Sequence, residues 1–180
     1  DLRPSDAQIV EGMQGFLGEI MQVPPQFSAV KIDGQRAYKL ARAGEQIEIA
    51  ARPLLVEELI LADRPTPDTA VLEMTCGKGG YVRAIARDLG AVLGCYGHVA
   101  HLRRIWSGPF DLEHAVTLEQ IESFAKTAEI GQFLRPLEVG LTDLPQGTTN
   151  AEGATKLRNG NPAICFTNAE YGDEIWVSYK

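Results

Sequence analysis

The sequence predicts an α+β fold, in which a mixed and mostly antiparallel sheet is flanked by helices. Helical and extended patterns follow one another along 180 residues, and 44% of the residues are hydrophobic, enough for one sizeable core. Capping-box patterns open two of the helical segments, and alternation of apolar and polar residues marks one clear strand between them. We expect a main domain at residues 1–138 and a truncated second unit at residues 139–180.

The first predicted helix begins at a capping box. Ser5 can accept the main-chain N–H of Gln8, whose side chain can reach back toward Ser5, and the helix is expected to run to about Phe16. Val23-Pro24-Pro25 cannot be helical, because the second proline bars Pro24 from the α region.

A strand, a turn and a short helix are predicted next. Phe27–Ile32 has the composition of a strand, and Asp33-Gly34 is a tight-turn signal. Gln35–Ala43 is predicted to be a short helix that ends at Gly44.

Two further strand regions precede a glycine-rich loop. The stretch Gln46–Ala62 is rich in Ile, Val and Leu but is broken by Pro53, so we predict two strands there. Thr69–Cys76 alternates between two faces and is expected to be a half-buried strand. The loop itself is Gly77-Lys78-Gly79-Gly80.

A helix and another strand follow the loop. Tyr81–Leu93 carries an apolar stripe and is closed by Gly94, so we predict a helix. Val99–Ile105 is predicted to be a strand.

The remainder of the chain has weaker signals. A second capping box, Thr117 with Gln120, opens a helix that should reach about Ala128, and residues 133–137 are expected to be a linker. The second unit is predicted to contain a helix, a turn and two strands, in the order Ala151–Arg158, Asn159–Pro162, Ala163–Phe166 and Glu174–Ser178.

Composition favours a reduced, cytoplasmic protein. Cys76, Cys95 and Cys165 are odd in number and form no CxxC pair, which disfavours a zinc site or a disulfide framework. No apolar run approaches the roughly 18 residues of a membrane span, and no signal peptide opens the chain. Because the sequence lacks an initiator Met, we expect it to be a piece of a longer protein.

Charge is distributed unevenly. The net charge of −7 taken alone disfavours nucleic acid, but basic residues dominate residues 31–42 and 78–104, each with a single acid. Such local basic faces suit RNA binding. A simple solvated surface explains the same pattern equally well.

The most informative stretch is Cys76–Arg83, in which a strand, a glycine-rich loop and a helix start succeed one another. Free N–H groups at such a helix start favour an anion. A phosphate-binding P-loop is excluded, because that motif needs Ser or Thr after its Lys and here Gly79 follows Lys78. A plain structural turn remains the alternative.

Two blocks of sequence resemble the TruB family of bacterial tRNA pseudouridine synthases. Residues 22–34, QVPPQFSAVKIDG, look like the family pattern Q-x-P-P-x-Y-S-A-x-K-x-x-G, and Cys76–Arg83 looks like C-S-K-G-T-Y-I-R. The resemblance runs from about Ser5 to Phe110. Weaker similarity near residues 158–162 implies the start of a PUA-like domain after the pseudouridine synthase fold.

The chain departs from the family pattern in three ways. Phe27 replaces a Tyr, and Gly77 and Gly80 replace Ser and Thr, which should make the loop more flexible. The family's catalytic Asp lies in a G-x-L-D motif, and no such motif occurs in these 180 residues. We therefore expect this chain alone to be inactive.

The resemblance implies an isomerase that flips a uridine of the tRNA T stem-loop and converts it to pseudouridine. It implies that Tyr81 stacks on the uracil, that Arg83 pairs with the catalytic carboxylate, and that Leu102 packs on the base. It implies RNA-facing roles for Lys31 and Arg42; further basic candidates are Lys78, Arg103 and Arg104. No cofactor, metal or membrane is implied.

Other hypotheses are weaker. His98 and His101 could suggest a metal, but in a strand their spacing would put them on opposite faces, and no third ligand is near in the sequence. An RNA-binding module without chemistry is the main alternative to the enzyme. A structural or protein-interaction domain is more remote, because the basic segments and the glycine-rich loop argue against it.

Overall fold

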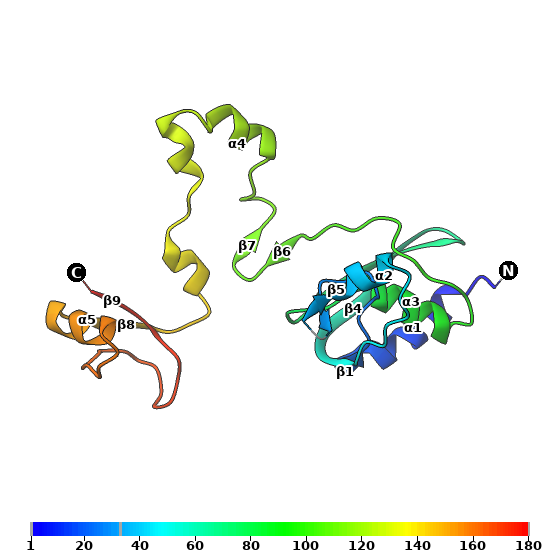
Figure 1. The fold of residues 1–180 in the computed structure, drawn as a ribbon, viewed down its shortest axis with the longest axis horizontal. Helices are drawn as coiled ribbons and strands as arrows, with labels where there is room; N and C mark the ends of the chain where they lie inside the picture. Colours follow the sequence, from blue (N-terminus) through cyan, green and yellow to red (C-terminus); the bar gives the residue numbers. More distant parts are fainter. Residues whose placement is uncertain (1, 33, 180) are drawn as a thin grey trace. The chain divides into compact units, whose positions relative to one another are not determined.

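A computed structural model describes residues 2–32 and 34–179 as two compact units, residues 1–102 and 103–180, and each is considered by itself (Figure 1). The turn predicted at Asp33-Gly34 includes Asp33, which lies outside the described residues, while Gly34 has a φ of 83°. The predicted domain boundary between residues 138 and 139 falls inside the second unit and stays a prediction. In the described part of the chain, no helix is long and apolar enough to cross a membrane.

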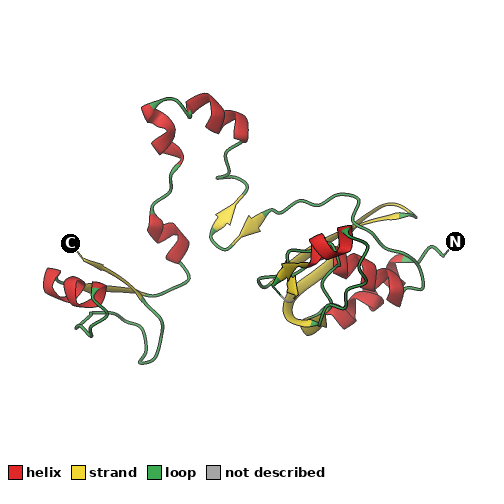
Figure 2. Ribbon diagram, in the orientation of Figure 1, coloured by secondary structure: helices red, strands yellow, loops and turns green. Residues whose placement is uncertain are grey.

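The first unit is built on a three-stranded antiparallel sheet. Its strand order is β1-β4-β5, with β1 at Gly18–Gln22, β4 at Arg52–Thr66 and β5 at Thr69–Cys76 (Figure 2). The strand predicted at residues 69–76 is confirmed. β1 was not predicted, and its only ladder in the sheet is with β4.

The prediction of two strands broken at Pro53 is wrong. β4 is one continuous strand, and Pro53 lies inside it opposite Met21 of β1. The ladder with β5 starts only at Val56, so Pro53 stands where β4 has a neighbour on one side only, the position in which a missing N–H is tolerated. Residues 46–51, where the first of the two predicted strands should begin, are irregular.

Helices α1 (Asp6–Met13) and α3 (Val82–Val92) pack on one face of this sheet. The capping box at Ser5 is confirmed, and a 3₁₀ turn, η1 (Gln14–Phe16), completes the predicted helix to Phe16. Gly94 follows α3 with a φ of 71°, as its predicted role as a helix stop requires.

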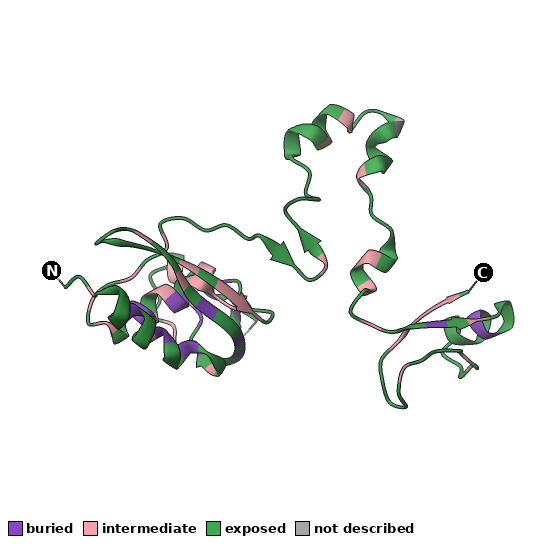
Figure 3. Cartoon of the chain, turned by 180° about the vertical axis from the view of Figure 1, so that it is seen from behind, coloured by how far each residue is buried: buried purple, intermediate pink, exposed green. Residues whose placement is uncertain are grey.

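The main core lies between the two helices and β4, and Figure 3 shows buried segments in these elements. Its buried residues come from α1 with η1, from β4 and from α3: Ile9, Met13, Phe16, Leu54, Val56, Leu59, Ile85 and Leu89. Alternate β4 residues point inward, and the register with β5 shifts at three places, the first of them after Val56.

A small excursion between β1 and β4 carries a second core cluster. It contains β2 (Lys31–Ile32), β3 (Gln35–Arg36) and α2 (Ala37–Arg42). The strand predicted at Phe27–Ile32 is confirmed only for its last two residues. Before them, the Ser28 and Val30 carbonyls accept the N–H groups of Tyr38 and Ala37 in α2 rather than those of a neighbouring strand. Val30, Ala37 and Ile49 are buried together here.

The strand predicted at Val99–Ile105 is wrong, since residues 96–105 form neither helix nor strand. Residues 96–105, the return segment after α3, instead begin with a close contact between their own main chain and the main chain of α3. A Cβ on Gly90 would overlap the Gly97 amide, and one on Gly97 would overlap the Ala86 carbonyl. Leu102 and Ile105 of this segment are exposed, so its apolar residues do not form the buried face of a strand.

The second unit opens with a hairpin and short helices. The hairpin strands β6 and β7 are Trp106–Ser107 and Phe110–Asp111. Helix α4 (Leu118–Phe124) begins at the predicted capping box but is shorter than expected, and 3₁₀ turns follow at η2 (Ala128–Phe133) and η3 (Leu137–Leu141).

The unit ends in a small parallel pair. Strands β8 (Gln146–Thr149) and β9 (Trp176–Tyr179) are parallel. Helix α5 (Ala151–Arg158) lies between them in sequence and has the predicted bounds. Of the strand predicted at Ala163–Phe166 only a single bridge, Thr148 to Phe166, is present. The second strand begins two residues later than expected.

Candidate functional site

The two family-like blocks meet at the start of α3. Gln22 ends β1, is only 5% exposed, and directs its side-chain amide at the main chain of Tyr81. Gln22 Oε1 accepts the Tyr81 N–H at 2.8 Å, and Gln22 Nε2 donates to the Tyr81 carbonyl at 3.2 Å. Residues 59 positions apart in sequence are thereby joined by a two-point hydrogen bond.

Two arginines of α3 continue the junction. Arg83 Nη2 donates to the Phe27 carbonyl at 2.7 Å, and Arg87 Nη2 donates to the Val23 carbonyl at 2.9 Å. Arg87 also holds Asp88, with Nε to Oδ1 at 2.6 Å, and this hydrogen bond raises the pKa of Arg87 above its ordinary value. Arg87 thus has hydrogen-bond partners in both Val23 and Asp88. Arg83 is exposed, and its hydrogen bond among the described residues is the one to the Phe27 carbonyl.

The pairing that the resemblance implies for Arg83 needs a carboxylate. Among the described residues, none forms an ion pair with Arg83. A guanidinium has five N–H donors in a planar fork, so the bond to Phe27 leaves donors for a carboxylate or a phosphate.

The glycine-rich loop is more closely packed than its composition predicts. Gly79 has a φ of 86°, a conformation that favours glycine. Gly80 is different, because a Cβ there would lie 2.8 Å from Cys76 Sγ and 3.2 Å from Leu54. The Gly80 departure from the family pattern therefore comes with close packing of the loop on β4 and β5.

Tyr81 is the N-cap residue of α3 and is half-buried. Its carbonyl accepts the N–H groups of Ala84 at 2.9 Å and Ile85 at 3.2 Å, and its side chain packs against the cluster of Val30, Ala37 and Ile49. The ring therefore stands between the glycine-rich loop and the excursion.

Leu102 lies in the irregular segment after α3 and is 62% exposed. It belongs to neither core cluster of the described chain. The structure thus brings Tyr81 and Arg83 together at one helix start, and the shared pocket of these two residues with Leu102 stays a prediction.

The predicted RNA-facing residues are exposed. Lys31 lies on β2, Arg42 at the end of α2 and Lys78 in the glycine-rich loop; Arg103 and Arg104 are exposed residues of the second unit. Arg42 stacks over the Tyr38 ring at 5.7 Å, and Lys31 stands directly opposite Arg36 in the β2–β3 ladder. Neither these five predicted side chains nor Arg36 has an ion pair with a described residue. Like charges opposite each other in a ladder are unfavourable without an anion.

Sequence reasoning missed Gln22 and Ser28 as site residues. Ser28 is 5% exposed, and its hydroxyl has no hydrogen-bond partner within the described part of the protein. Both lie inside the QVPPQFS stretch, so the signal was present as polar residues within a family-like motif.

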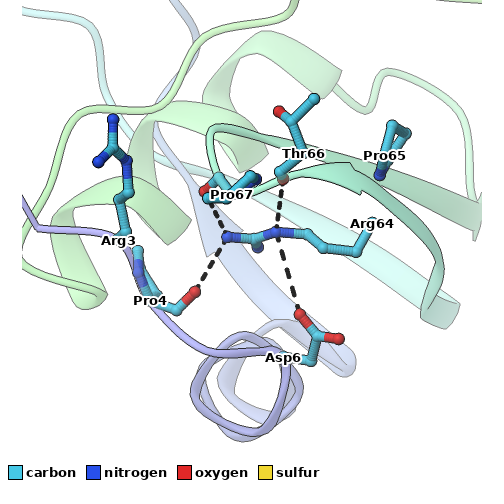
Figure 4. A pocket seen from close by; sticks show the side chains of 7 residues that line it. All are labelled: Arg3, Pro4, Asp6, Arg64, Pro65, Thr66 and Pro67. Carbon is cyan, nitrogen blue, oxygen red and sulfur yellow. Dashed lines mark hydrogen bonds and ion pairs between the residues drawn. The ribbon is translucent and has the colours of Figure 1, made fainter.

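Two pockets flank the first unit. One of about 440 Å³ lies beside the junction and includes Gln22, Ile85 and Asp88 in its lining. The other, of about 350 Å³, lies where β4 turns into β5, at the end of the ladder away from Cys76 (Figure 4). There Arg64 donates to the Pro4, Thr66 and Pro67 carbonyls and faces Asp6.

Arg64 in that second pocket is fully engaged in holding the N-terminal segment to the hairpin, so the pocket is structural. Within residues 2–32 and 34–179, no group of three or more His, Cys, Asp or Glu side chains is arranged to hold a metal ion.

Two family models match the chain in succession. Residues 2–82 match one described as "TruB family pseudouridylate synthase (N terminal domain)", and residues 83–142 match one described as "tRNA pseudouridylate synthase B C-terminal domain". The boundary between the matches falls between Val82 and Arg83, at the start of α3.

Curated relatives are similar over the whole chain. The tRNA pseudouridine synthase B of Ruegeria pomeroyi is 67% identical over 181 residues, which cover 100% of this chain and 60% of the relative. That of Paracoccus denitrificans is 54% identical over 99% of this chain and 59% of the relative. The chain therefore spans about 60% of the length of the curated relatives it matches.

Solved structures share the fold. A chain from "Crystal Structure of a Cbf5-Nop10-Gar1 Complex" is similar with a TM-score of 0.71 and 22% identity, over 98% of this chain and 52% of that one. A chain from "Structure of H/ACA RNP bound to a substrate RNA containing 2'-deoxyuridine" gives a TM-score of 0.67 at 18% identity, over 99% and 52%. At this identity the likeness concerns the fold alone, and it confirms the predicted α+β class.

Proposed function

The chain belongs to the TruB family of pseudouridylate synthases, and on this premise we propose that the whole protein isomerises a uridine in the T stem-loop of tRNA to pseudouridine. The observation that carries the proposal is the hydrogen-bonded junction at α3. There the QVPPQFS block meets Tyr81 and Arg83 through side chains that contact main-chain groups. An arrangement of this kind aims two functional side chains from a rigid helix start.

The proposed reaction assigns a separate task to each site residue. The target uridine is flipped out of the RNA, at a cost of a few kcal/mol that contacts in the pocket offset. Tyr81 stacks on the uracil and Leu102 packs on it. Arg83 holds a carboxylate in its charged form and fixes its direction, which a guanidinium does better than an ammonium group.

Phosphate contacts supply most of the affinity in this proposal. Lys31 and Arg42 sit on the excursion, and Lys78 sits on the loop beside Tyr81, so all three lie in the elements that meet at the junction. Arg103 and Arg104 extend the basic set. Such contacts are sequence-independent and weaken with salt. The proposed chemistry requires neither a metal nor a cofactor, and the proposed compartment is the cytoplasm.

A second candidate, an RNA-binding module without chemistry, is favoured by two observations. No described carboxylate pairs with Arg83, and the 180 residues contain no G-x-L-D motif. We therefore expect these residues by themselves to bind RNA without forming pseudouridine.

A tritium-release assay on tRNA transcripts labelled at uridine C5 tests both candidates. The full-length protein is expected to release tritium from the intact transcript and not from one whose T-loop uridines are replaced by cytidine. The 180-residue chain is expected to bind the transcript in filter assays without release. Turnover by the pure chain would contradict its predicted inactivity, and no release by the full-length protein would refute the proposed enzyme.

A further inference from the structure

We propose that Gln22 is a positioning residue for Tyr81, and that its side-chain amide fixes where the Tyr81 ring stands in the uridine pocket. The inference rests on the proposed function, because it assigns Gln22 a part in that reaction. It concerns a residue that contacts the main chain of Tyr81 rather than the RNA.

The local sequence leaves Tyr81 poorly fixed. It follows a loop with three glycines among four residues, and it caps α3 without a side-chain cap hydrogen bond of its own. The α3 amides of Ala84 and Ile85 bind its carbonyl, but nothing within the loop or the helix binds its N–H in the described contacts. Local structure therefore holds the Tyr81 carbonyl but gives no partner to the Tyr81 N–H, which belongs to the Gly80–Tyr81 peptide.

Gln22 supplies the missing restraint from another element. Its Oε1 accepts the Tyr81 N–H at 2.8 Å and its Nε2 donates to the Tyr81 carbonyl at 3.2 Å, so one planar amide holds both sides of the residue. Gln22 is itself fixed, since it ends the β1–β4 ladder opposite Arg52 and is 5% exposed. A buried amide with both polar ends satisfied is a rigid support.

The neighbouring contacts leave this role to Gln22. Arg83 and Arg87 also donate to main-chain carbonyls of the segment that follows β1. Both residues lie at exposed positions on α3 and reach these carbonyls through long side chains. Gly80 lies close to Cys76 and Leu54, and these contacts do not involve the Tyr81 N–H. The ring itself packs against Val30, Ala37 and Ile49, and the Gln22 amide ties the main chain that carries the ring to β1.

Two substitutions separate the two hydrogen bonds. Gln22→Glu keeps an acceptor for the Tyr81 N–H but loses the donor, whereas Gln22→Met keeps the unbranched shape and loses both. Gln14→Met is the matched control, because Gln14 is an exposed glutamine whose side-chain amide donates to the Val10 carbonyl within its own helical segment.

Amide hydrogen exchange on the 180-residue chain measures directly how well the Gln22 side chain protects the Tyr81 N–H. In Gln22→Met, the Tyr81 amide should exchange at least about tenfold faster while the Leu89 and Leu93 amides keep their rates. Gln22→Glu should give a smaller acceleration, and Gln14→Met none. Equal acceleration of all α3 amides would show a general loss of stability and would overturn the positioning role.

Single-turnover kinetics on the full-length protein measure the effect of the Gln22 substitutions on catalysis. Gln22→Met should lower the rate at saturating tRNA by roughly tenfold or more, since small misplacements of a site residue have large effects, with tRNA affinity within about twofold. Gln22→Glu should recover part of the rate. If the unsubstituted protein turns over and Gln22→Met matches it, the inference is wrong while the proposed function stands. If the unsubstituted protein does not turn over, the proposed function itself fails, and the role in turnover fails with it.

Discussion

At the scale of single residues, the site is organised by side chains that bind main-chain groups of another segment. Gln22, Arg83 and Arg87 each reach a peptide group 56 to 64 positions away. Main-chain groups are present whatever the side chain, so these contacts fix the path of the chain even where a motif residue is replaced, as at Phe27.

Arg83 is expected to act on chemistry more than on binding. In the full-length protein, Arg83→Ala should lower the single-turnover rate by about a hundredfold, because a catalytic carboxylate without its cation is misaligned and more readily protonated. Arg83→Lys should lose less, since it keeps the charge without the fork. Filter binding of tRNA should change little, as phosphate contacts are spread over other residues.

Arg135→Ala is a suitable control for Arg83, because Arg135 is also an exposed arginine and lies outside the proposed site. If Arg83→Ala weakens tRNA binding strongly while saturated turnover is normal, Arg83 contacts a phosphate and the assigned role is wrong.

A second residue-scale prediction concerns pH. The His114 side chain, 2.7 Å from Asp111 through Nδ1, and the His114 main-chain N–H lower the pKa of Asp111 below its ordinary value of 3.8. A carboxyl whose pKa is lower in the folded state stabilises the fold above its unfolded pKa, and this contribution is lost as pH falls through the folded pKa.

An NMR titration of the Asp111 carboxyl should therefore give a pKa below 3.8, and His114→Ala should move it back upward. The main-chain N–H remains in that variant, so the return should be incomplete. An unchanged Asp111 pKa in His114→Ala would show that the imidazole contact is absent in solution.

At the scale of elements, backbone contacts decide features that propensity does not. Pro53 is accepted inside β4 because the ladder with β5 has not yet begun there. Gly90 lies in a helix, where alanine is the better helix former, yet the return segment leaves no room for a methyl group.

Gly90→Ala should therefore destabilise the chain by about 1–3 kcal/mol, because overpacking against main chain outweighs the roughly 1 kcal/mol gain in helix propensity. A Cβ at this position would overlap Gly97 and lie 2.9 Å from the Tyr96 carbonyl carbon. Gly15→Ala is the matched control, since its Cβ would have no atom within 4 Å. Urea unfolding of both variants checks this, and equal midpoints would contradict the close packing of the return segment.

At the scale of the whole molecule, the two units differ in how much core they contain. Both clusters of buried hydrophobic residues lie between Ile9 and Leu89, inside residues 1–102. Among the described residues of the second unit, Ala154 is the one buried hydrophobic residue. The second unit is held by short ladders, one capping box and contacts such as the edge-on packing of Phe124 and Phe133 at 5.4 Å.

Residues 1–102 on their own should therefore unfold cooperatively, with a thermal midpoint close to that of the corresponding transition in the 180-residue chain. Residues 103–180 alone should show a broad transition, since a small unit with little core is marginal. Calorimetry on the two pieces and the intact chain checks this. A non-cooperative profile for residues 1–102 would mean that its core needs the second unit.

The sequence by itself determined the features that depend on neighbouring residues. Both capping boxes, the stop of α3 at Gly94, the alternating strand β5 and helix α5 were predicted because each follows from a few adjacent side chains and main-chain groups. The family also followed from two short blocks, since motif residues are readable without knowing where they lie in space.

Only the tertiary structure decided which distant groups meet. β1, the continuity of β4 through Pro53 and the irregular path of residues 96–105 depend on which face or neighbour the chain finds after folding. For the same reason, Gln22 could not be predicted as a site residue. A lone glutamine gains this role only when folding brings Tyr81 against it. Hydrogen bonds between segments far apart in sequence, rather than local pattern, set the geometry of the site.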